Sequence, residues 1–273
     1  MPNQSLVSIF LIFFILVFYG GVVLAEKSFY APDFDYFKSY PLHTYQLAVK
    51  PLSWEQDDWL WAGGIAGATL VLFALDESIQ DWSQENKNNF TKKVAKIAKP
   101  FGDGNLLLPL SGGVYLWGLM EKNPRMQKAA LNSVQSFFAA GIFSEIVKTL
   151  FQRHRPSTGN SYDTFEGPGW PRKHQSFSSG HACVAFAVGT VFAEEFSDYP
   201  AIPEISYSIA TLTALSRVHD NDHWASDVFF GSAIGYFTSR GVMALNEESK
   251  NWAGELKPFY SGDNMGLGYY FSF

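Results

Sequence analysis

The chain has 273 residues, enough for one sizeable hydrophobic core, and its 47% apolar and 17% aromatic content excludes intrinsic disorder. Its formal net charge of −6 excludes the broad basic surface of a nucleic-acid-binding protein. Its single cysteine, Cys183, excludes an intramolecular disulfide and a zinc site with several cysteine ligands.

The N-terminal 25 residues predict export to the cell envelope. An apolar run from Ser5 to Ala25 ends in Val-Leu-Ala, which is typical of a signal-peptide cleavage site. The run is also long enough to cross a bilayer. We therefore expect residues 1–25 to be a signal peptide or a membrane anchor and the protein to be periplasmic. Three prolines, Pro32, Pro41 and Pro51, predict an irregular lead-in over residues 26–57.

Residues 58–245 form a chain of helical patterns, and we expect them to make one helical domain. The predicted helices cover Trp59–Leu75, 90–99, Leu106–Met120, Lys128–Phe151, His181–Phe196, Ile205–Val218 and about Trp224–Leu245. The acidic sequence after Leu75 is expected to end the first of them. A loop rich in Pro, Gly and Ser covers residues 155–180, and loops of this length are usually functional.

The C-terminal tail, residues 246–273, ends in a strand pattern. Alternation places Leu267, Tyr269, Phe271 and Phe273 on one face of a strand. The fold class expected from the whole chain is therefore all-α, a helical bundle with a short C-terminal strand or extended tail.

Membrane insertion is open at this point. Apolar runs near 60–75, 129–147 and 227–242 approach the length of a membrane span, but the mean hydropathy of the chain is only −0.04, and most runs carry polar residues or are shorter than about 20 residues. We expect a compact helical domain that contacts the membrane, with an integral arrangement as the alternative.

Three polar clusters are candidates for one site. In the first, Lys148 and Arg155 are two helical turns apart and could present an ammonium and a guanidinium fork to one oxyanion. In the second, Ser179, Gly180 and His181 begin a helix, where free backbone N–H groups bind anions. Each cluster also has a plain structural interpretation, as a solvated helix end and as an ordinary N-cap.

The third cluster contains Arg217, His223 and Asp227. Because His223 and Asp227 are four residues apart, the carboxylate could hold one imidazole nitrogen and leave the other free to attack. The pair His219 and His223 has the same spacing and could instead bind a metal. A polar turn between helices is the plain alternative. Arg153, close to the first cluster, is expected to be solvated or at most at the substrate rim.

Together the clusters resemble the type 2 phosphatidic acid phosphatase and vanadium haloperoxidase superfamily. The family's three motifs, K-x6-R-P, P-S-G-H and S-R-x5-H-x3-D, are matched in order by Lys148…Arg155-Pro156, Ser178-Ser179-Gly180-His181 and Ser216-Arg217…His223…Asp227. Ser178 replaces the usual proline, a position that shapes the turn and supplies no chemical group. The segments "ALDESIQDW" and "FGDGN" also look like upstream parts of the family.

The resemblance implies a helical bundle of the vanadium-chloroperoxidase and acid-phosphatase type, and a phosphatase that works through a phosphohistidine. It implies His223 as nucleophile oriented by Asp227, and His181 as general acid and then base. It further implies a phosphate cradle, with no metal or other cofactor, made of Lys148, Arg155, Arg217, Ser179 and Gly180.

Several alternatives remain open. Vanadium haloperoxidases hold vanadate as a cofactor in the same cradle, whereas a phosphatase would be inhibited by it. A metal hydrolase would explain His219 and His223 but not Lys148 or Arg155, and a non-enzymatic envelope protein would have no need of the filled motifs. The substrate could be a lipid phosphate at a membrane or a soluble phosphomonoester of a periplasmic acid phosphatase. The oligomeric state is not predicted.

Overall fold

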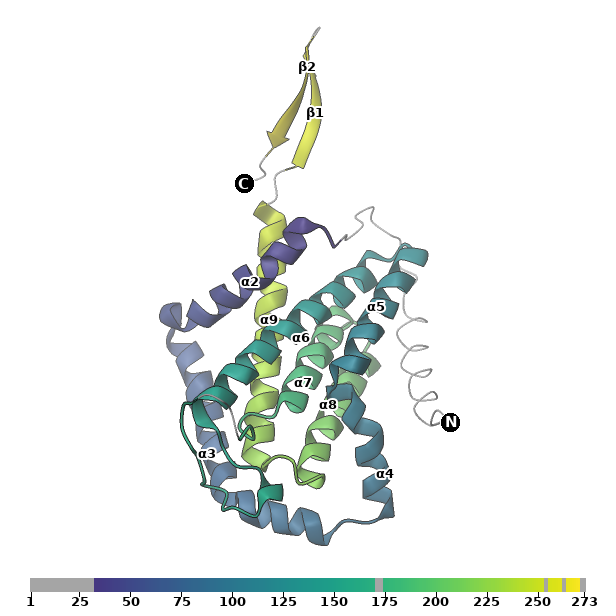
Figure 1. The fold of residues 1–273 in the computed structure, drawn as a ribbon. Helices are drawn as coiled ribbons and strands as arrows, with labels where there is room; N and C mark the ends of the chain where they lie inside the picture. The colour runs from purple at the N-terminus through teal and green to yellow at the C-terminus, as the bar shows by residue number, and fades with distance from the viewer. Residues whose placement is uncertain (1–31, 170–173, 253–254, 262–263, 271–273) are drawn as a thin grey trace.

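The computed structural model of the chain describes residues 32–169, 174–252, 255–261 and 264–270 (Figure 1). Residues 1–25, with the predicted signal or anchor, and also Phe271 and Phe273 lie outside this part. The helices are α2 (Phe34–Val49), α3 (Gln56–Glu85), α4 (Asn89–Ala98), α5 (Gly104–Met120), α6 (Pro124–Phe151), α7 (Gly180–Glu195), α8 (Ala201–His219) and α9 (Ala225–Trp252). A hairpin of β1 (Glu255–Ser261) and β2 (Asn264–Tyr270) follows α9. The all-α bundle with a short C-terminal strand element is confirmed.

Helix α7 is the centre of the bundle and packs against α6, α8 and α9 (Figure 1). A glycine allows this close packing. The backbones of α9 and α7 approach so closely at Gly235 and Cys183 that a Cβ on residue 235 would have no room. The main apolar core joins α5, α6 and α7, and includes Leu107, Val114, Met126, Val188 and Phe192. The end of α8 and the start of α9 meet at the lower end of the bundle in Figure 1.

The predicted irregular lead-in over residues 26–57 is wrong for its described part. Asp33 caps α2 by accepting a hydrogen bond from the Tyr36 backbone N–H, and the Tyr36 hydroxyl donates to the Leu131 carbonyl of α6. Pro41 lies inside this helix. The prolines predicted irregular structure, but capping by Asp33 and packing on α6 stabilise a helix that the local sequence disfavours.

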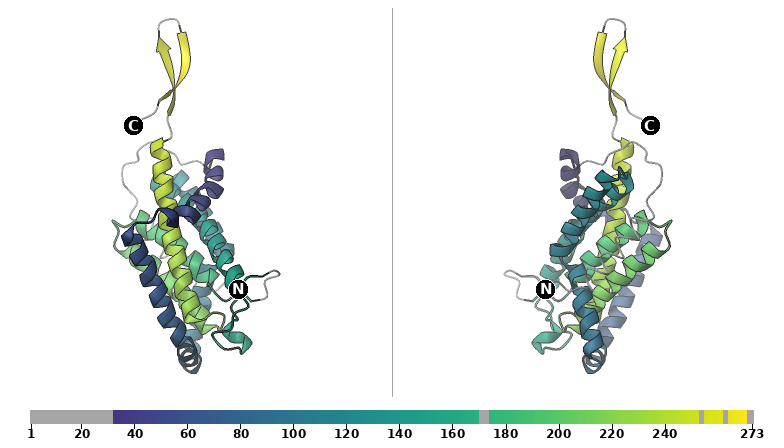
Figure 2. Two further views of the ribbon diagram at one scale, coloured as in Figure 1. Left: turned by 90° about the vertical axis from the view of Figure 1, so that its left-hand side faces the viewer. Right: turned by 90° about the vertical axis from the view of Figure 1, so that its right-hand side faces the viewer.

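Helix α3 continues ten residues beyond the expected end at Leu75. The acidic sequence that was expected to end it places Asp76 inside the protein, where its side chain is fully buried. Helix α3 lies alongside α9 (Figure 2). Burial of one carboxylate at this contact allows the helix to pass through a polar stretch of sequence.

Helix α6 ends at Phe151, as expected, because Gln152 adopts a left-handed conformation with φ 45° and donates its N–H to the Lys148 carbonyl. Arg155 therefore lies in extended backbone beyond the helix, with φ −80° and ψ 152°. The two-turn spacing of Lys148 and Arg155 therefore does not place them on one helix, because only Lys148 belongs to α6.

Helices α3 and α6 are long and apolar enough to cross a membrane, by length and composition alone. Only 6% of the apolar window of α3 and 28% of that of α6 is buried inside the protein. The exposed side chains of α3 include Trp59, Leu60, Trp61, Leu70 and Val71. The apolar runs near 60–75 and 129–147, which were expected to be too short for a span, thus lie within the longer helices α3 and α6. The outward apolar surface of these helices fits membrane association.

Candidate active site

His223 lies in the turn between α8 and α9, and 3% of its surface is exposed. Its Nδ1 is 2.8 Å from the Ser176 carbonyl oxygen. Since a carbonyl only accepts hydrogen bonds, Nδ1 carries the proton and Nε2 keeps a free lone pair in the neutral imidazole. Burial lowers the pKa of His223, and the nearby cations Arg155 and Arg217 act in the same direction, against Asp227. The imidazole is therefore neutral at pH 7 and can act as a nucleophile.

Asp227 contributes to this arrangement less directly than its spacing predicts. Its Oδ2 is 3.8 Å from His223 Nδ1, beyond hydrogen-bond distance, and instead accepts from the backbone N–H of Trp224 at 2.9 Å and from the Ser176 hydroxyl. The reason is that α9 begins at Ala225, so His223 precedes the helix and does not share a face with Asp227. Asp227 is thus connected to His223 through Ser176, whose hydroxyl donates to Asp227 and whose carbonyl accepts from His223.

Arg153 lies inside the protein, contrary to prediction. It was expected to be solvated, but its side chain is 0% exposed and is paired with two buried carboxylates. One terminal nitrogen of the guanidinium is 2.7 Å from Asp76, and the other is 2.6 Å from Asp227. Ser226 joins the same network by donating its backbone N–H to Asp76 at 2.9 Å. Helix α3, the loop after α6 and the start of α9 are thereby fixed beneath His223.

The start of α7 lies against α9 and α6. Ser179 is the N-cap, accepts from the Ala182 N–H, and donates its own N–H to the Asp227 carbonyl at 3.0 Å. Of the four N–H groups at this helix start, those of Gly180 and His181 have no acceptor among the described residues. A Cβ on Gly180 would lie 3.0 Å from Lys148 Nζ, so a larger residue here would press on the end of this lysine beside the two N–H groups.

Arg217 supplies buried donors to the same region. It is 4% exposed, and its Nε and one terminal nitrogen lack a hydrogen-bond partner within the described chain. Its other terminal nitrogen pairs closely with Asp222, which lies 3.6 Å from Arg155. Buried guanidinium donors without acceptors are costly, and an oxyanion would satisfy them. The Asp222 carboxylate thus lies between Arg217 and Arg155, close to where a bound oxyanion would lie.

His181 lies close to the other charged groups of the site. Burial lowers its pKa to about 4, and the positive charge of Arg217 and the neighbouring His223 add to this effect. Gly102, at the end of the turn after α4, packs directly on His181. The structure thus brings the predicted residues from α6, the long loop, α7, α8 and α9 into one region.

One cluster of the described residues has the ligand types of a metal site, and it is not the predicted alternative. His154 and His174 stack with ring centres 3.5 Å apart and both approach Glu166, at 3.3 Å and 3.2 Å. His219 instead contacts Asp220 at 3.2 Å and Thr91 at 3.3 Å. Across the described ranges, no metal-ligand group combines His219 with His223.

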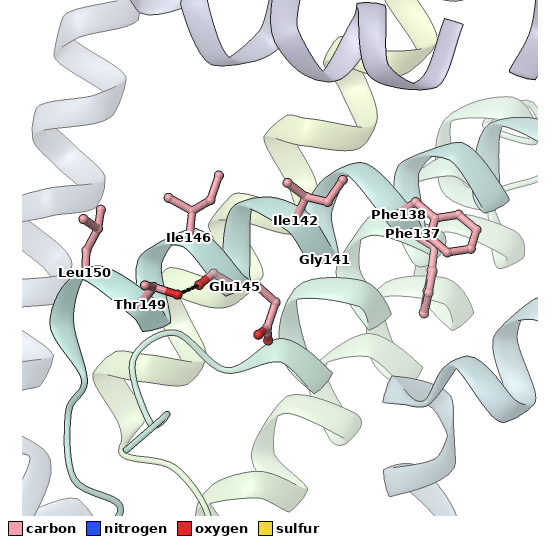
Figure 3. Close-up of a pocket in the computed structure, with 8 residues that line it drawn as sticks. All are labelled: Phe137, Phe138, Gly141, Ile142, Glu145, Ile146, Thr149 and Leu150. Atoms are coloured by element: carbon pink, nitrogen blue, oxygen red, sulfur yellow. Dashed lines mark hydrogen bonds between the residues drawn. The ribbon is translucent and has the colours of Figure 1, made fainter. Parts of the chain in front are cut away.

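An apolar groove of about 590 Å³ follows α6 on the side of Glu145 (Figure 3). Phe137, Phe138, Ile142, Ile146 and Leu150 line most of it. Glu145 also lines the groove and accepts from Lys148 Nζ at 2.7 Å. The groove is therefore linked to the cationic site through this ion pair.

Comparison with known proteins is consistent with these motifs. Residues 129–251 match the family model of the PAP2 superfamily. A lipid A 1-phosphatase of Porphyromonas gingivalis is 27% identical over 176 residues, which are 63% of this chain and 35% of that protein. A PA-phosphatase related-family protein of Dictyostelium discoideum is 27% identical over 156 residues, 50% of this chain and 58% of that protein. The matched regions thus span between about a third and three fifths of these relatives.

Two solved structures are also similar. A transmembrane PAP2 type phosphatidylglycerolphosphate phosphatase from Bacillus subtilis has a TM-score of 0.49 at 20% identity, over 68% of this chain and 95% of that one. LpxE of Aquifex aeolicus has a TM-score of 0.48 at 18% identity, over 62% of this chain and 95% of that one. Every predicted site residue, from Lys148 to Asp227, lies inside the family match. Residues 129–251 of this chain, which contain all three motifs, are therefore similar to the PAP2 superfamily.

Proposed function

We propose that the protein is a metal-independent phosphatase that hydrolyses phosphate esters or diphosphates through a phosphohistidine on His223. This function is supported by two features that lie together in one region of the protein. One is a buried neutral imidazole whose Nε2 has no hydrogen bond among the described residues, and the other is buried Arg217, with two donor groups that lack a hydrogen-bond partner there. A nucleophile beside guanidinium donors that lack hydrogen-bond partners suits attack on a phosphate.

The reaction runs in two displacements. His223 Nε2 forms a bond to phosphorus while the bond to the leaving oxygen breaks, and the leaving oxygen takes a proton from His181. Water then attacks phosphorus, the P–N bond breaks, inorganic phosphate departs and His181 takes a proton from the water. Binding of the phosphate dianion raises the proton affinity of His181, since it offsets the cations that now lower its pKa.

The cradle neutralises the charge on the transferred phosphoryl group. Lys148, Arg155 and Arg217 supply the cations, and the N–H groups of Gly180 and His181 supply directed donors at the positive end of α7. Ser179 contributes by capping that helix start and joining it to Asp227. Asp222 pairs with the remaining terminal nitrogen of Arg217, so its carboxylate competes with a bound phosphate for the charge of this guanidinium.

We propose lipid phosphates as the substrates and the cell envelope as the location. The exposed apolar side chains of α3 and the groove of α6 suit a membrane environment, and the Porphyromonas gingivalis relative is named a lipid A 1-phosphatase. A membrane-apposed site gives access to the headgroup while the apolar surfaces remain in lipid.

The test is hydrolysis by the full chain and by His223→Ala, with phosphate release measured on lipid and soluble phosphates in membrane and soluble fractions. We expect the wild type to act on lipid phosphates, vanadate to inhibit and millimolar EDTA to have no effect. His223→Ala should lose activity and keep its helical circular dichroism. Turnover by a folded His223→Ala protein would refute His223 as the nucleophile. Loss of activity in EDTA would refute metal independence and indicate a metal site, for which His154, Glu166 and His174 are the candidate ligands. Halide oxidation with vanadate and peroxide would favour a haloperoxidase instead.

A further inference from the structure

A second polar cavity lies beside His181, on the side of α4 and the end of α8. Its volume is about 400 Å³, and its lining includes Lys92, Lys96, Lys99, His181 and His219. His181 is the only residue shared by this cavity and the proposed catalytic machinery among the residues described. The cavity therefore opens at the general acid, and not at the nucleophile.

Three lysines and two aspartates, Asp103 and Asp220, line the cavity, so its lining carries a net positive charge. Lys92 and Lys96 are one helical turn apart on α4, and neither has a carboxylate partner in the described part of the chain. Lys99 is 3.3 Å from Asp220 and 3.9 Å from Asp222, so it is shared between two acids. The remaining acid, Asp103, is engaged as the cap of α5 and accepts the Asn105 N–H at 2.9 Å.

The position of His181 determines what enters this cavity. A general acid contacts the oxygen of the leaving group, so the atoms that follow that oxygen lie next to His181. If an alkyl chain followed the leaving oxygen directly, its apolar atoms would lie against the ammonium groups of the three lysines. A phosphate in that place would instead form charge-assisted hydrogen bonds with them. The second phosphate must be adjacent to the first, because His181 borders both sites.

On the basis of the proposed function, we infer that the lysine cavity of α4 binds the inner phosphate of a diphosphate whose terminal phosphate is attacked by His223. The bond between the terminal phosphorus and the bridging oxygen breaks, and that oxygen departs with its electron pair as part of a monophosphate ester. A phosphate leaving group is stable as an anion, whereas an alkoxide needs a full proton. The low pKa of His181 is thus less limiting for a diphosphate than for a simple ester.

The experiment compares farnesyl diphosphate with farnesyl monophosphate, which share one chain and differ in the inner phosphate. We expect wild-type kcat/KM to be at least about tenfold higher for the diphosphate. The variant Lys92→Gln/Lys96→Gln should lower the ratio of the two kcat/KM values by about tenfold. Lys93→Gln is the matched control, because Lys93 is an exposed lysine of the same helix that does not line the cavity. It should keep the wild-type ratio.

Binding of inorganic pyrophosphate and phosphate, measured by calorimetry, tests the cavity without turnover. Pyrophosphate should bind more tightly than phosphate to the wild type, and the double variant should lose this advantage. Equal kcat/KM for both farnesyl substrates, or a double variant with an unchanged ratio and unchanged pyrophosphate binding, would overturn the inference while leaving the phosphatase intact. Absence of hydrolysis of either substrate, with pyrophosphate still bound through the lysines, would instead refute the proposed function.

Discussion

Substitution of Arg153 by lysine tests whether the buried ion network stabilises the site. The guanidinium donates to Tyr162 O at 2.8 Å, Ser226 Oγ at 2.8 Å, Asp227 at 2.6 Å and Asp76 at 2.7 Å. Lysine keeps the charge, but its single nitrogen cannot extend to both carboxylates as the planar fork does. Loss of two hydrogen bonds to charged groups, each about 1.5–3 kcal/mol, predicts destabilisation of about 3 kcal/mol or more.

The assay is thermal unfolding of the purified full chain, followed by circular dichroism at a fixed scan rate. For a domain of this size, about 3 kcal/mol corresponds to a fall in Tm of about 6–12 °C. Arg155→Lys is the control, because 39% of that side chain is exposed and its nearest carboxylate, on Asp222, is 3.6 Å away. It should lower kcat/KM and leave Tm nearly unchanged. A Tm for Arg153→Lys within about 2 °C of wild type would refute the stabilising role of the fork.

Three further predictions concern residues of the candidate site. Gly180→Ala should displace Lys148 Nζ and lower kcat/KM by about tenfold or more with little change in Tm, whereas Gly112→Ala, which meets no atom within 4 Å, should leave kcat/KM unchanged. Asp222→Asn should strengthen vanadate inhibition about tenfold by removing the anion that competes for Arg217, and unchanged inhibition would contradict that competition. The pKa of His181 lies near 4 in the folded chain and at 6.5 when unfolded, so its contribution to stability is complete above pH 6.5 and is lost as pH falls toward 4. The loss totals about 3 kcal/mol, and His181→Gln should flatten the fall of Tm with pH over this interval.

Local sequence patterns predicted most of the helices, because apolar periodicity and capping residues act over a few residues. The expected helix over 90–99 and α4 (Asn89–Ala98) differ by one residue at each end, and Asn88 caps α4 by accepting two backbone N–H groups. Helices α2 and α3 departed from prediction where distant contacts decide the structure. Asp76 lies 77 residues before its partner Arg153, and no local pattern relates the two.

The candidate site was predictable as a set of residues but not as a set of contacts. Motif spacing identified His223 and Asp227, but their four-residue separation implies a shared face only inside a helix, and α9 begins after His223. The acceptor of His223 Nδ1 is a main-chain carbonyl, Ser176 O, and every residue type offers a carbonyl. Sequence therefore carries no signal for this contact. The segment "ALDESIQDW" carried the only available indication of Asp76.

The network around Asp227 explains how His223, the proposed nucleophile, can be held neutral beside several cations. If Asp227 alone bonded to His223, its charge would favour the imidazolium and reduce the free lone pair at Nε2. Instead, Arg153 and the Trp224 N–H share the negative charge of Asp227, and an uncharged carbonyl fixes the His223 tautomer. In the proposed mechanism His223 becomes cationic on phosphorylation, and Asp227 at 3.8 Å is near enough to stabilise that charge. The arrangement thus favours the neutral histidine before attack and supports the positive charge that attack creates.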